Sequence, residues 1–339
     1  MQDVLINVAT LTYNQGGYIR QCIESVLTQR TSFPFTYVIA DDGSDDGTTE
    51  IVQEYARAYP DVIVPVLVER VSPRRTVRKM FEACKGTYVT LCEGDDYYTD
   101  VERLQRMAEF LETRPELAAC FHPVSVRVEG QEDTCTLYPN LERFAHLRGR
   151  DVFYLEDLLH ANIVQTNGVM YRWRFCDGMP DWFKEDLIPG DWYWHLLHAE
   201  AGPFGWLDRP MSVYRRHPKG MWWDADYNRI RHLEHNARRE LNFYQEINAH
   251  FKGCHLEEIK GHVFNLIIEI IRHCARSNDK YPLRRVCRDY HQWYALLIAE
   301  VAREQNTRLL DMLNFLTPPR YRERCRVARK NFSEYLPCA

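Results

Sequence analysis

The sequence predicts an α/β protein with a mostly parallel sheet flanked by helices, followed by a helical C-terminal region. Apolar runs of strand length alternate with helical stripes over the first half of the chain, and polar loops follow the strands. Strands that alternate with helices favour parallel β-α-β packing. Beyond about residue 224 the periodicity becomes helical throughout. With 339 residues the chain is long enough for two domains, which we place at 1–223 and 224–339.

Each predicted element rests on a pattern of apolar residues. The strands are short runs rich in β-branched and apolar residues, and the helices carry apolar residues at three- and four-residue steps. Gly86 ends the third helix and Pro115 closes the fourth. In chain order we expect strands at 4–11, 35–40, 62–68, 87–92 and 118–128, and helices at 18–27, 48–58, 77–85, 104–111 and 155–159.

Composition narrows the class of protein. Hydrophobic residues make up 45% and charged residues 27% of the chain, which argues for a globular protein and against disorder. The eleven cysteines form no Cys-x-x-Cys pair and follow no signal peptide, which favours reduced thiols in the cytoplasm. The first loop lacks Gly-x-Gly-x-x-Gly and no Walker A sequence occurs, which weakens dehydrogenase and P-loop interpretations.

Three carboxylates crowd into four positions directly after the strand at 87–92. Glu93, Asp95 and Asp96 should lie at the carboxyl end of that strand, where open α/β sheets bind ligands. Like charges this close raise one another's pKa unless a cation or donor network offsets them. One interpretation is an acidic turn before a helix. We favour the other, a divalent metal shared with a phosphate, since Mg²⁺ and Mn²⁺ take few protein carboxylates plus substrate oxygens.

Polar residues also follow the first two strands. Tyr13 could stack on a nucleobase, and Asp42 could accept a hydrogen bond from a ring N–H or a ribose hydroxyl. Each residue has a structural alternative. The segment 41–44 makes a good Asx turn, and a tyrosine before Gly16 could simply cover the loop.

Six short motifs occur in a fixed order between residues 4 and 223. They are Thr12-Tyr13-Asn14, Asp41-Asp42-Gly43-Ser44-Asp45-Asp46-Gly47-Thr48, Ala83-Cys84-Lys85-Gly86, Glu93-Gly94-Asp95-Asp96-Tyr97-Tyr98, Gly190-Asp191-Trp192 and Tyr214-Arg215-Arg216-His217. In that order they resemble the motifs of family 2 glycosyltransferases. The sequence departs from that pattern at Glu93, where Asp is commoner, and at Leu11, where Pro is frequent.

This resemblance implies the GT-A fold, a Rossmann-like mixed sheet, and an inverting, metal-dependent reaction. A sugar would pass from a nucleoside diphosphate sugar, with a UDP- or dTDP-sugar favoured, to a hydroxyl of a glycan or lipid-linked saccharide. Synthesis of surface polysaccharide is the implied setting. Position by position, it implies nucleobase contacts for Tyr13 and Asp42, a place near the ribose for Glu93, metal coordination by Asp95 and support of the loop by Asp96.

Two later motifs complete the implied site. Asp191 matches the catalytic base, although it could also be the N-cap of a helix that starts at Trp192. His217 matches a position that approaches the metal or the diphosphate, and its alternative is an exposed basic strand end. The expected cofactor is Mn²⁺ or Mg²⁺, and a neutral imidazole ligand suits Mn²⁺ better than Mg²⁺.

Two other functions compete with glycosyl transfer. A sugar-1-phosphate nucleotidyltransferase also needs a nucleotide and a metal on an α/β sheet, but its glycine-rich, basic N-terminal loop is missing here. The third function is a nucleotide-sugar-binding or glycan-binding module without turnover. The presence of both Asp95 and Asp191 counts against that module.

Residues 276–330 carry 13 Lys and Arg against 6 Asp and Glu. The tract 320–330 could rest on anionic lipid at the inner face of the cell membrane, which would make the protein a peripheral one. A solvated surface is our default interpretation. No nucleic acid partner is expected, and the chain is compatible with an oligomer.

Overall fold

The computed structural model describes residues 5–68, 73–131, 135–140, 144, 147–180, 182–184, 187–277, 281–303, 313 and 317. The chain divides into two compact units. The first unit comprises Met1–Asp186 and Gly190–Gly220, and the second comprises Leu187–Pro189 and Met221–Ala339.

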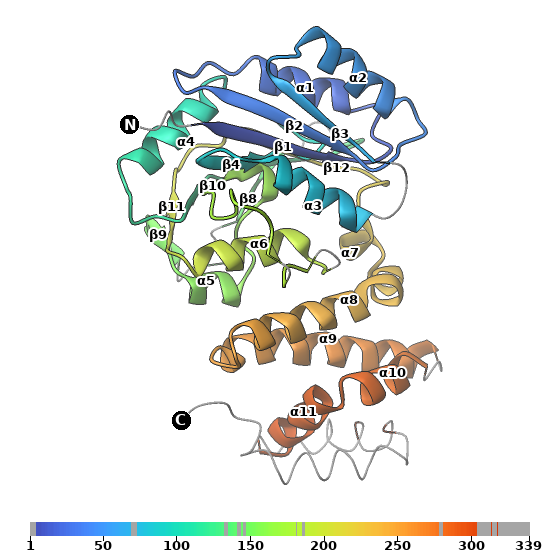
Figure 1. The fold of residues 1–339 in the computed structure, drawn as a ribbon. Coiled ribbons are helices and arrows are strands. Elements are labelled where there is room, and N and C mark those ends of the chain that lie inside the picture. The colour runs from blue at the N-terminus through green and yellow to red at the C-terminus, as the bar shows by residue number, and fades with distance from the viewer. Residues whose placement is uncertain are drawn as a thin grey trace. The chain divides into compact units, whose positions relative to one another are not determined.

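The first unit is built on an eight-stranded sheet with the order β3-β2-β1-β4-β10-β6-β11-β9 (Figure 1). Parallel pairing joins β3 to β2, β2 to β1, β1 to β4 and β6 to β11, whereas β10 and β9 pair antiparallel with their neighbours. The predicted α/β fold with a mostly parallel sheet is therefore confirmed. The strands are β1 (Ile6–Thr12), β2 (Phe35–Asp41), β3 (Ile63–Leu67), β4 (Tyr88–Leu91), β6 (Ala119–Phe121), β9 (Val152–Phe153), β10 (Val169–Arg172) and β11 (Phe204–Trp206).

Helices cover both faces of this sheet (Figure 1). Alternate residues of β1, Ile6 and Val8, pack in one hydrophobic cluster with the apolar stripes of α1 (Ile19–Leu27), α2 (Thr48–Ala58) and α4 (Arg103–Glu112). On the opposite face lie α3 (Pro73–Ala83) and α6 (Gly190–Ala199), where Phe81 of α3 makes an edge contact with Trp194 of α6 at 4.9 Å between ring centroids. A short helix, α5 (Leu155–His160), contacts α6.

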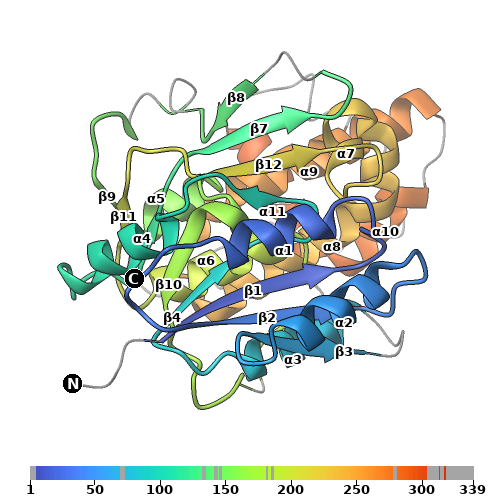
Figure 2. The ribbon, with the colours of Figure 1, turned by 90° about the horizontal axis from the view of Figure 1, so that it is seen from above.

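A second sheet has the order β5-β12-β7-β8 (Figure 2). Its strands are β5 (Tyr97–Tyr98), β7 (Val124–Val128), β8 (Cys135–Tyr138) and β12 (Ser212–Arg216). The single strand predicted at 118–128 is wrong, because β6 ends at Phe121 and β7 begins at Val124 in the other sheet. Pro123 between them has no N–H to donate to a ladder, so the chain leaves one sheet there and enters the next.

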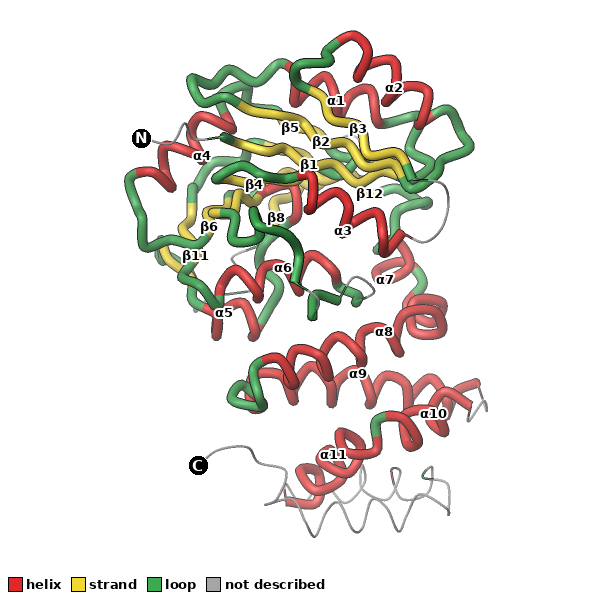
Figure 3. The backbone as a smooth tube through the Cα atoms, in the orientation of Figure 1, coloured by secondary structure: helices red, strands yellow, loops and turns green. Residues whose placement is uncertain are grey.

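The second unit is helical over its described residues, as the sequence predicted (Figure 3). Apolar faces of α8 and α9 pack together, with Leu241, Ile247, Val263 and Ile267 all buried. Within the described ranges, every helix is too short or too polar to cross a bilayer. The basic tract 320–330 lies outside these ranges. The helices are α7 (Trp223–Tyr227), α8 (Arg229–His250), α9 (Leu256–Ser277), α10 (Tyr281–Asp289) and α11 (His291–Arg303).

Candidate active site

The acidic loop, residues 93–96, leaves the central sheet directly after β4. Its turn is packed against the end of β1, because the backbone N–H of Gly94 donates to Leu11 O at 3.2 Å. A Cβ atom at Gly94 would lie 2.7 Å from Thr12 Oγ1 and closer still to Gln15 Oε1. Only glycine therefore lets the acidic loop approach the end of β1 this closely.

Replacing Gly94 with alanine is expected to destabilise the protein by about 1 to 3 kcal/mol, because the added methyl group overpacks the contact with Thr12 and Gln15. Urea denaturation measures the change. Gly17→Ala is the matched control, since a Cβ atom there would meet nothing within 4 Å. Equal midpoints for the Gly94→Ala variant and the wild type would contradict the packing described here.

Asp96 anchors the acidic loop from within the protein. Its side chain is fully buried and accepts hydrogen bonds from Asn167 Nδ2 at 2.9 Å and from the backbone N–H of Arg215 at 2.8 Å. Burial raises the pKa of Asp96, and the neighbouring Asp95 and Glu93 raise it further. The two donors tie the loop to the 3-10 helix η2 (Thr166–Gly168) and to strand β12.

Asp95 lies against His217, which follows β12. The carboxylate Oδ2 of Asp95 is 2.9 Å from His217 Nε2, and Arg215 donates to the backbone carbonyl of Asp95 at 2.6 Å. The imidazole is buried, stacks obliquely on Tyr18 at 4.7 Å, and has no hydrogen-bond partner for Nδ1 among the described residues. The structure thus brings together the two residues for which the sequence predicted metal binding.

Asp95 and His217 suit a metal ion that takes most of its ligands from a bound substrate. A carboxylate oxygen and a neutral imidazole nitrogen are both ligands that Mn²⁺ accepts. Across the ranges that the structure describes, no three His, Cys, Asp or Glu side chains gather into a metal-binding group. Asp95 and His217 would therefore leave most coordination positions to water and diphosphate oxygens, as is usual for such ions.

Tyr13 and Asp42 lie side by side at the ends of β1 and β2. The backbone N–H of Asp42 donates to Thr12 O at 3.1 Å, which places Asp42 next to Tyr13 across the parallel pair. Tyr13 is 37% exposed, whereas Asp42 is buried and accepts a hydrogen bond from the hydroxyl of Thr76. The turn-forming role belongs to Asp41, whose carboxylate accepts from Ser44 and Thr49.

Glu93 is the first carboxylate of the acidic loop. Burial raises the pKa of Glu93 to about 8, with further contributions from the charges of Asp95 and Asp191. An electrostatic influence of this kind requires short separations, since charges interact weakly across solvent. The charges of Asp95 and Asp191 therefore both reach Glu93, although Asp95 and Asp191 are 96 positions apart in the sequence.

Asp191 lies in the first turn of α6, which begins at Gly190 and not at Trp192. The N-cap alternative is therefore wrong for this residue. Its carboxylate accepts a hydrogen bond from Asn162 Nδ2 at 3.2 Å. Burial raises the pKa of Asp191, while hydrogen bonds from the Trp192 backbone and from Asn162 lower it in part. A partly exposed carboxylate with a raised pKa can accept a proton from a substrate hydroxyl.

A fully buried cation, Arg103, lies beneath the acidic loop. It donates to Asn167 O at 2.9 Å, to Thr90 Oγ1 at 3.0 Å and to His122 Nε2 at 2.9 Å. Burial and the charge of Arg103 hold the pKa of His122 well below its usual range, so the ring is neutral. Arg103 thus reaches Asp96 through Asn167.

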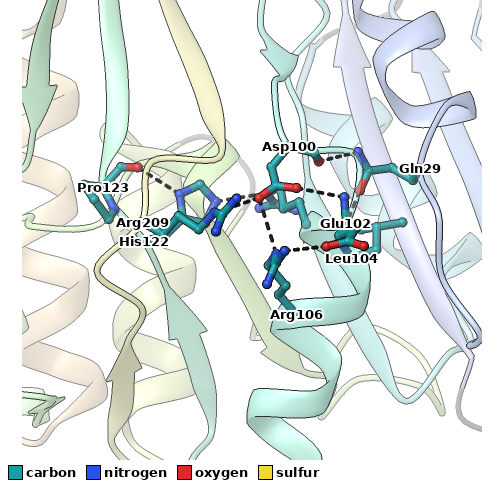
Figure 4. A network of polar contacts seen from close by, with 9 residues as sticks. Gln29, Asp100, Glu102, Leu104, Arg106, His122, Pro123 and Arg209 are labelled. Carbon is teal, nitrogen blue, oxygen red and sulfur yellow. Dashed lines mark hydrogen bonds and ion pairs between the residues drawn. The ribbon is translucent and has the colours of Figure 1, made fainter.

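The charged groups at the start of α4 are arranged differently around Asp100. Its carboxylate lies 2.8 Å from Arg209 Nε and 3.4 Å from Arg106 Nε (Figure 4). Sequence reasoning missed Arg103, Asn162 and Asn167. A basic residue at the start of a helix is normally predicted to be exposed to solvent. Isolated asparagines in a region without clear periodicity do not indicate a functional role.

Comparisons with known proteins agree with this geometry. Residues 8–163 match the family model described as Glycosyl transferase family 2. An uncharacterized protein of Mycobacterium tuberculosis (strain ATCC 25618 / H37Rv) is 37% identical over 232 residues, which cover 68% of this chain and 64% of that protein. The uncharacterized glycosyltransferase EpsJ of Bacillus subtilis (strain 168) is 22% identical over 301 residues, 84% of this chain and 82% of EpsJ.

Solved structures share the fold. The crystal structure of S. aureus TarS 1-349 in complex with UDP matches with a TM-score of 0.52 and 15% identity, over 97% of this chain and 91% of that one. The mannosyltransferase PcManGT from Pyrobaculum calidifontis, in complex with GDP-Man and Mn²⁺, matches with a TM-score of 0.50 and 14% identity, over 97% and 87%. The GT-A fold is thereby confirmed. Over residues 8–163, the predicted resemblance to family 2 glycosyltransferases is confirmed by the family model.

Proposed function

We propose that this protein is a metal-dependent, inverting glycosyltransferase. It moves a sugar from a nucleoside diphosphate sugar to a hydroxyl of a glycan or lipid-linked saccharide in the synthesis of surface polysaccharide. The observation that carries the proposal is the pair formed by Asp95 and His217, 2.9 Å apart, at an acidic loop whose Glu93 also responds to the charge of Asp191. Such an arrangement provides carboxylates for two separate tasks, holding the donor and deprotonating the acceptor.

The donor end of the site is formed by the first two strand ends. Tyr13 offers an exposed ring on which a nucleobase can stack. Asp42, held by Thr76, accepts a hydrogen bond from a ring N–H, which uracil and thymine offer at N3. A UDP- or dTDP-sugar is therefore the favoured donor, with Glu93 near the ribose. UDP-GlcNAc bound to TarS and GDP-Man bound to PcManGT support nucleotide sugars as the substrate class.

Asp95 and His217 would hold Mn²⁺ or Mg²⁺ next to the diphosphate, with the acidic loop kept in place by Asp96. When bound, the metal would supply positive charge that stabilises the leaving diphosphate. Asp191 accepts the proton of the acceptor hydroxyl while the hydroxyl oxygen attacks the anomeric carbon of the donor sugar. Asp191 acts from the first turn of α6, so the base and the donor-holding loop belong to separate elements.

A donor screen tests the proposal. Melting temperature is measured with UDP-GlcNAc, dTDP-glucose or GDP-mannose, each with and without Mn²⁺. A donor at about 100 times its Kd adds roughly 2.7 kcal/mol of stability, or about 4 °C for a chain of this length. We expect such a rise for a uridine or thymidine donor, and a smaller one without Mn²⁺. The absence of any rise with all three donors would count against the proposal.

Product analysis separates the proposed reaction from its competitors. Sugar transfer or donor hydrolysis releases a nucleoside diphosphate, whereas a nucleotidyltransferase exchanges pyrophosphate. A binding module would raise the melting temperature with a donor but release neither product. Release of UDP from UDP-GlcNAc in the presence of Mn²⁺ would exclude both competitors.

A further inference from the structure

Asn162 stands next to the proposed base without belonging to any motif of the sequence. It lies in the loop that follows α5, and its Nδ2 donates to Asp191 Oδ2 at 3.2 Å. Two further contacts fix Asn162 itself. Its backbone carbonyl accepts a hydrogen bond from the hydroxyl of Tyr138, and its Oδ1 accepts from the backbone N–H of Val164 at 3.4 Å.

Three described groups interact electrostatically with the Asp191 carboxylate, and none of these three is a cation. Glu93 on the acidic loop is negative when ionised, and Tyr138 on β8 and Tyr171 on β10 are phenols whose pKa values burial raises. Tyr171 is in turn paired with His195 of α6, at 2.6 Å between its hydroxyl and Nδ1. Burial also lowers the pKa of His195 to about 3, so that ring is neutral.

From these contacts we infer that Asn162 is a positioning residue for the proposed base, holding the Asp191 carboxylate in a fixed orientation through a neutral donor. This inference rests on the proposed function. A carboxylate on a helix end can rotate about two side-chain torsions, and a general base works only when its oxygen faces the proton that it accepts. Asn162 restricts that rotation, and Tyr138 and the Val164 backbone in turn restrict Asn162.

The chemistry of the donor explains why an amide is suited to this place. An arginine or lysine here would also orient the carboxylate, but a nearby cation lowers the pKa of a carboxyl group by one to three units. That would weaken Asp191 as a proton acceptor. The amide of Asn162 orients the carboxylate and favours its ionised form only moderately, so the base keeps a raised pKa.

Two variants test the assignment. Asn162→Leu removes the donor at similar size, and Asn162→Asp keeps the shape but replaces the donor with a negative charge. UDP release from UDP-GlcNAc with Mn²⁺ is followed from pH 5 to pH 9. For Asn162→Leu we expect about a tenfold lower kcat at pH 7, an unchanged KM for the donor, and an acid limb about one pH unit higher. Asn162→Asp should move the limb further. The matched control is Gln53→Leu, which removes an exposed amide on α2.

A second measurement does not depend on turnover. The pKa of Asp191 is followed by ¹³C NMR of labelled aspartate carboxyl groups, assigned with the Asp191→Asn variant. We expect it to rise by about one unit in Asn162→Leu. An unchanged pKa of Asp191 in a folded Asn162→Leu variant would overturn the inference, whether or not that variant is active. A raised pKa in Asn162→Leu, together with a wild type that releases no UDP, would instead count against the proposed function and leave the Asn162 contact standing.

Discussion

The Asp191→Asn variant is expected to transfer sugar about 10² to 10⁴ times more slowly than the wild type, because an amide cannot accept the proton of the acceptor hydroxyl. The side chain keeps its size, so binding of the donor should not change. Both quantities are measurable, the first as release of nucleoside diphosphate and the second as the donor-induced rise in melting temperature. Asp208→Asn is the matched control, since that carboxylate is exposed.

The raised pKa of Asp191 adds two expectations about pH. A base acts when it is deprotonated, so activity should fall as pH decreases through a pKa above the usual carboxyl range. When the pKa of a carboxyl group is higher in the folded than in the unfolded state, its contribution to the stability of the protein is lost as the pH rises through the folded pKa. Asp191→Asn should therefore be at least as stable as the wild type at neutral pH. Nearly full turnover by this variant would remove Asp191 from its assigned role.

Arg103→Ala is expected to lower the free energy of unfolding by about 3 to 5 kcal/mol. The change leaves a cavity under the acidic loop. It removes the hydrogen bonds that Arg103 donates to Asn167 O and His122 Nε2, which leaves two buried acceptors without that donor. It also removes the guanidinium that lies 4.1 Å from the centre of the Tyr98 ring. Urea denaturation followed by circular dichroism measures the loss.

The control for Arg103 comes from the same helix. Arg106 is a partly exposed arginine one turn further along α4, with ion pairs to the exposed Glu102 and to the mostly buried Asp100. Asp100 keeps its pair with Arg209 when Arg106 is removed, so we expect Arg106→Ala to cost about 1 kcal/mol. Similar losses for Arg103→Ala and Arg106→Ala would mean that the buried network adds nothing beyond an ordinary surface ion pair.

Local patterns were enough to predict most of the central sheet and its helices. The helix predicted at 48–58 has those bounds in the structure, because its apolar stripe and the preceding glycine leave little choice. The prediction failed where a long-range pairing decides the outcome. Residues 118–128 alternate as one strand would, yet Ala119–Phe121 and Val124–Val128 join different sheets. Strands of two residues, such as Tyr97–Tyr98, are too short to give a periodic signal.

Residue types at strand ends pointed to Tyr13, Asp42 and the acidic loop, whereas Asp191 and His217 were predicted from the resemblance to family 2 glycosyltransferases. Asp95 lies against His217, and the charges of Asp95 and Asp191 both act on Glu93. The supporting residues could not be predicted, since their importance comes from contacts across long stretches of sequence. Asn167, for example, meets Asp96 from 71 positions away. The roles assigned to the individual site residues stay predictions until the variants described above are measured.

The two hydrogen bonds of Asp96 limit how this protein could be re-engineered. Residues 93–96 cannot be exchanged on their own, because the Asp96 carboxylate accepts hydrogen bonds from both Asn167 and the backbone of Arg215. A chimera that received only the acidic loop of a relative would inherit a buried aspartate with the wrong neighbours. Exchanges of donor specificity should therefore transplant the three segments around Asp96, Asn167 and Arg215 together.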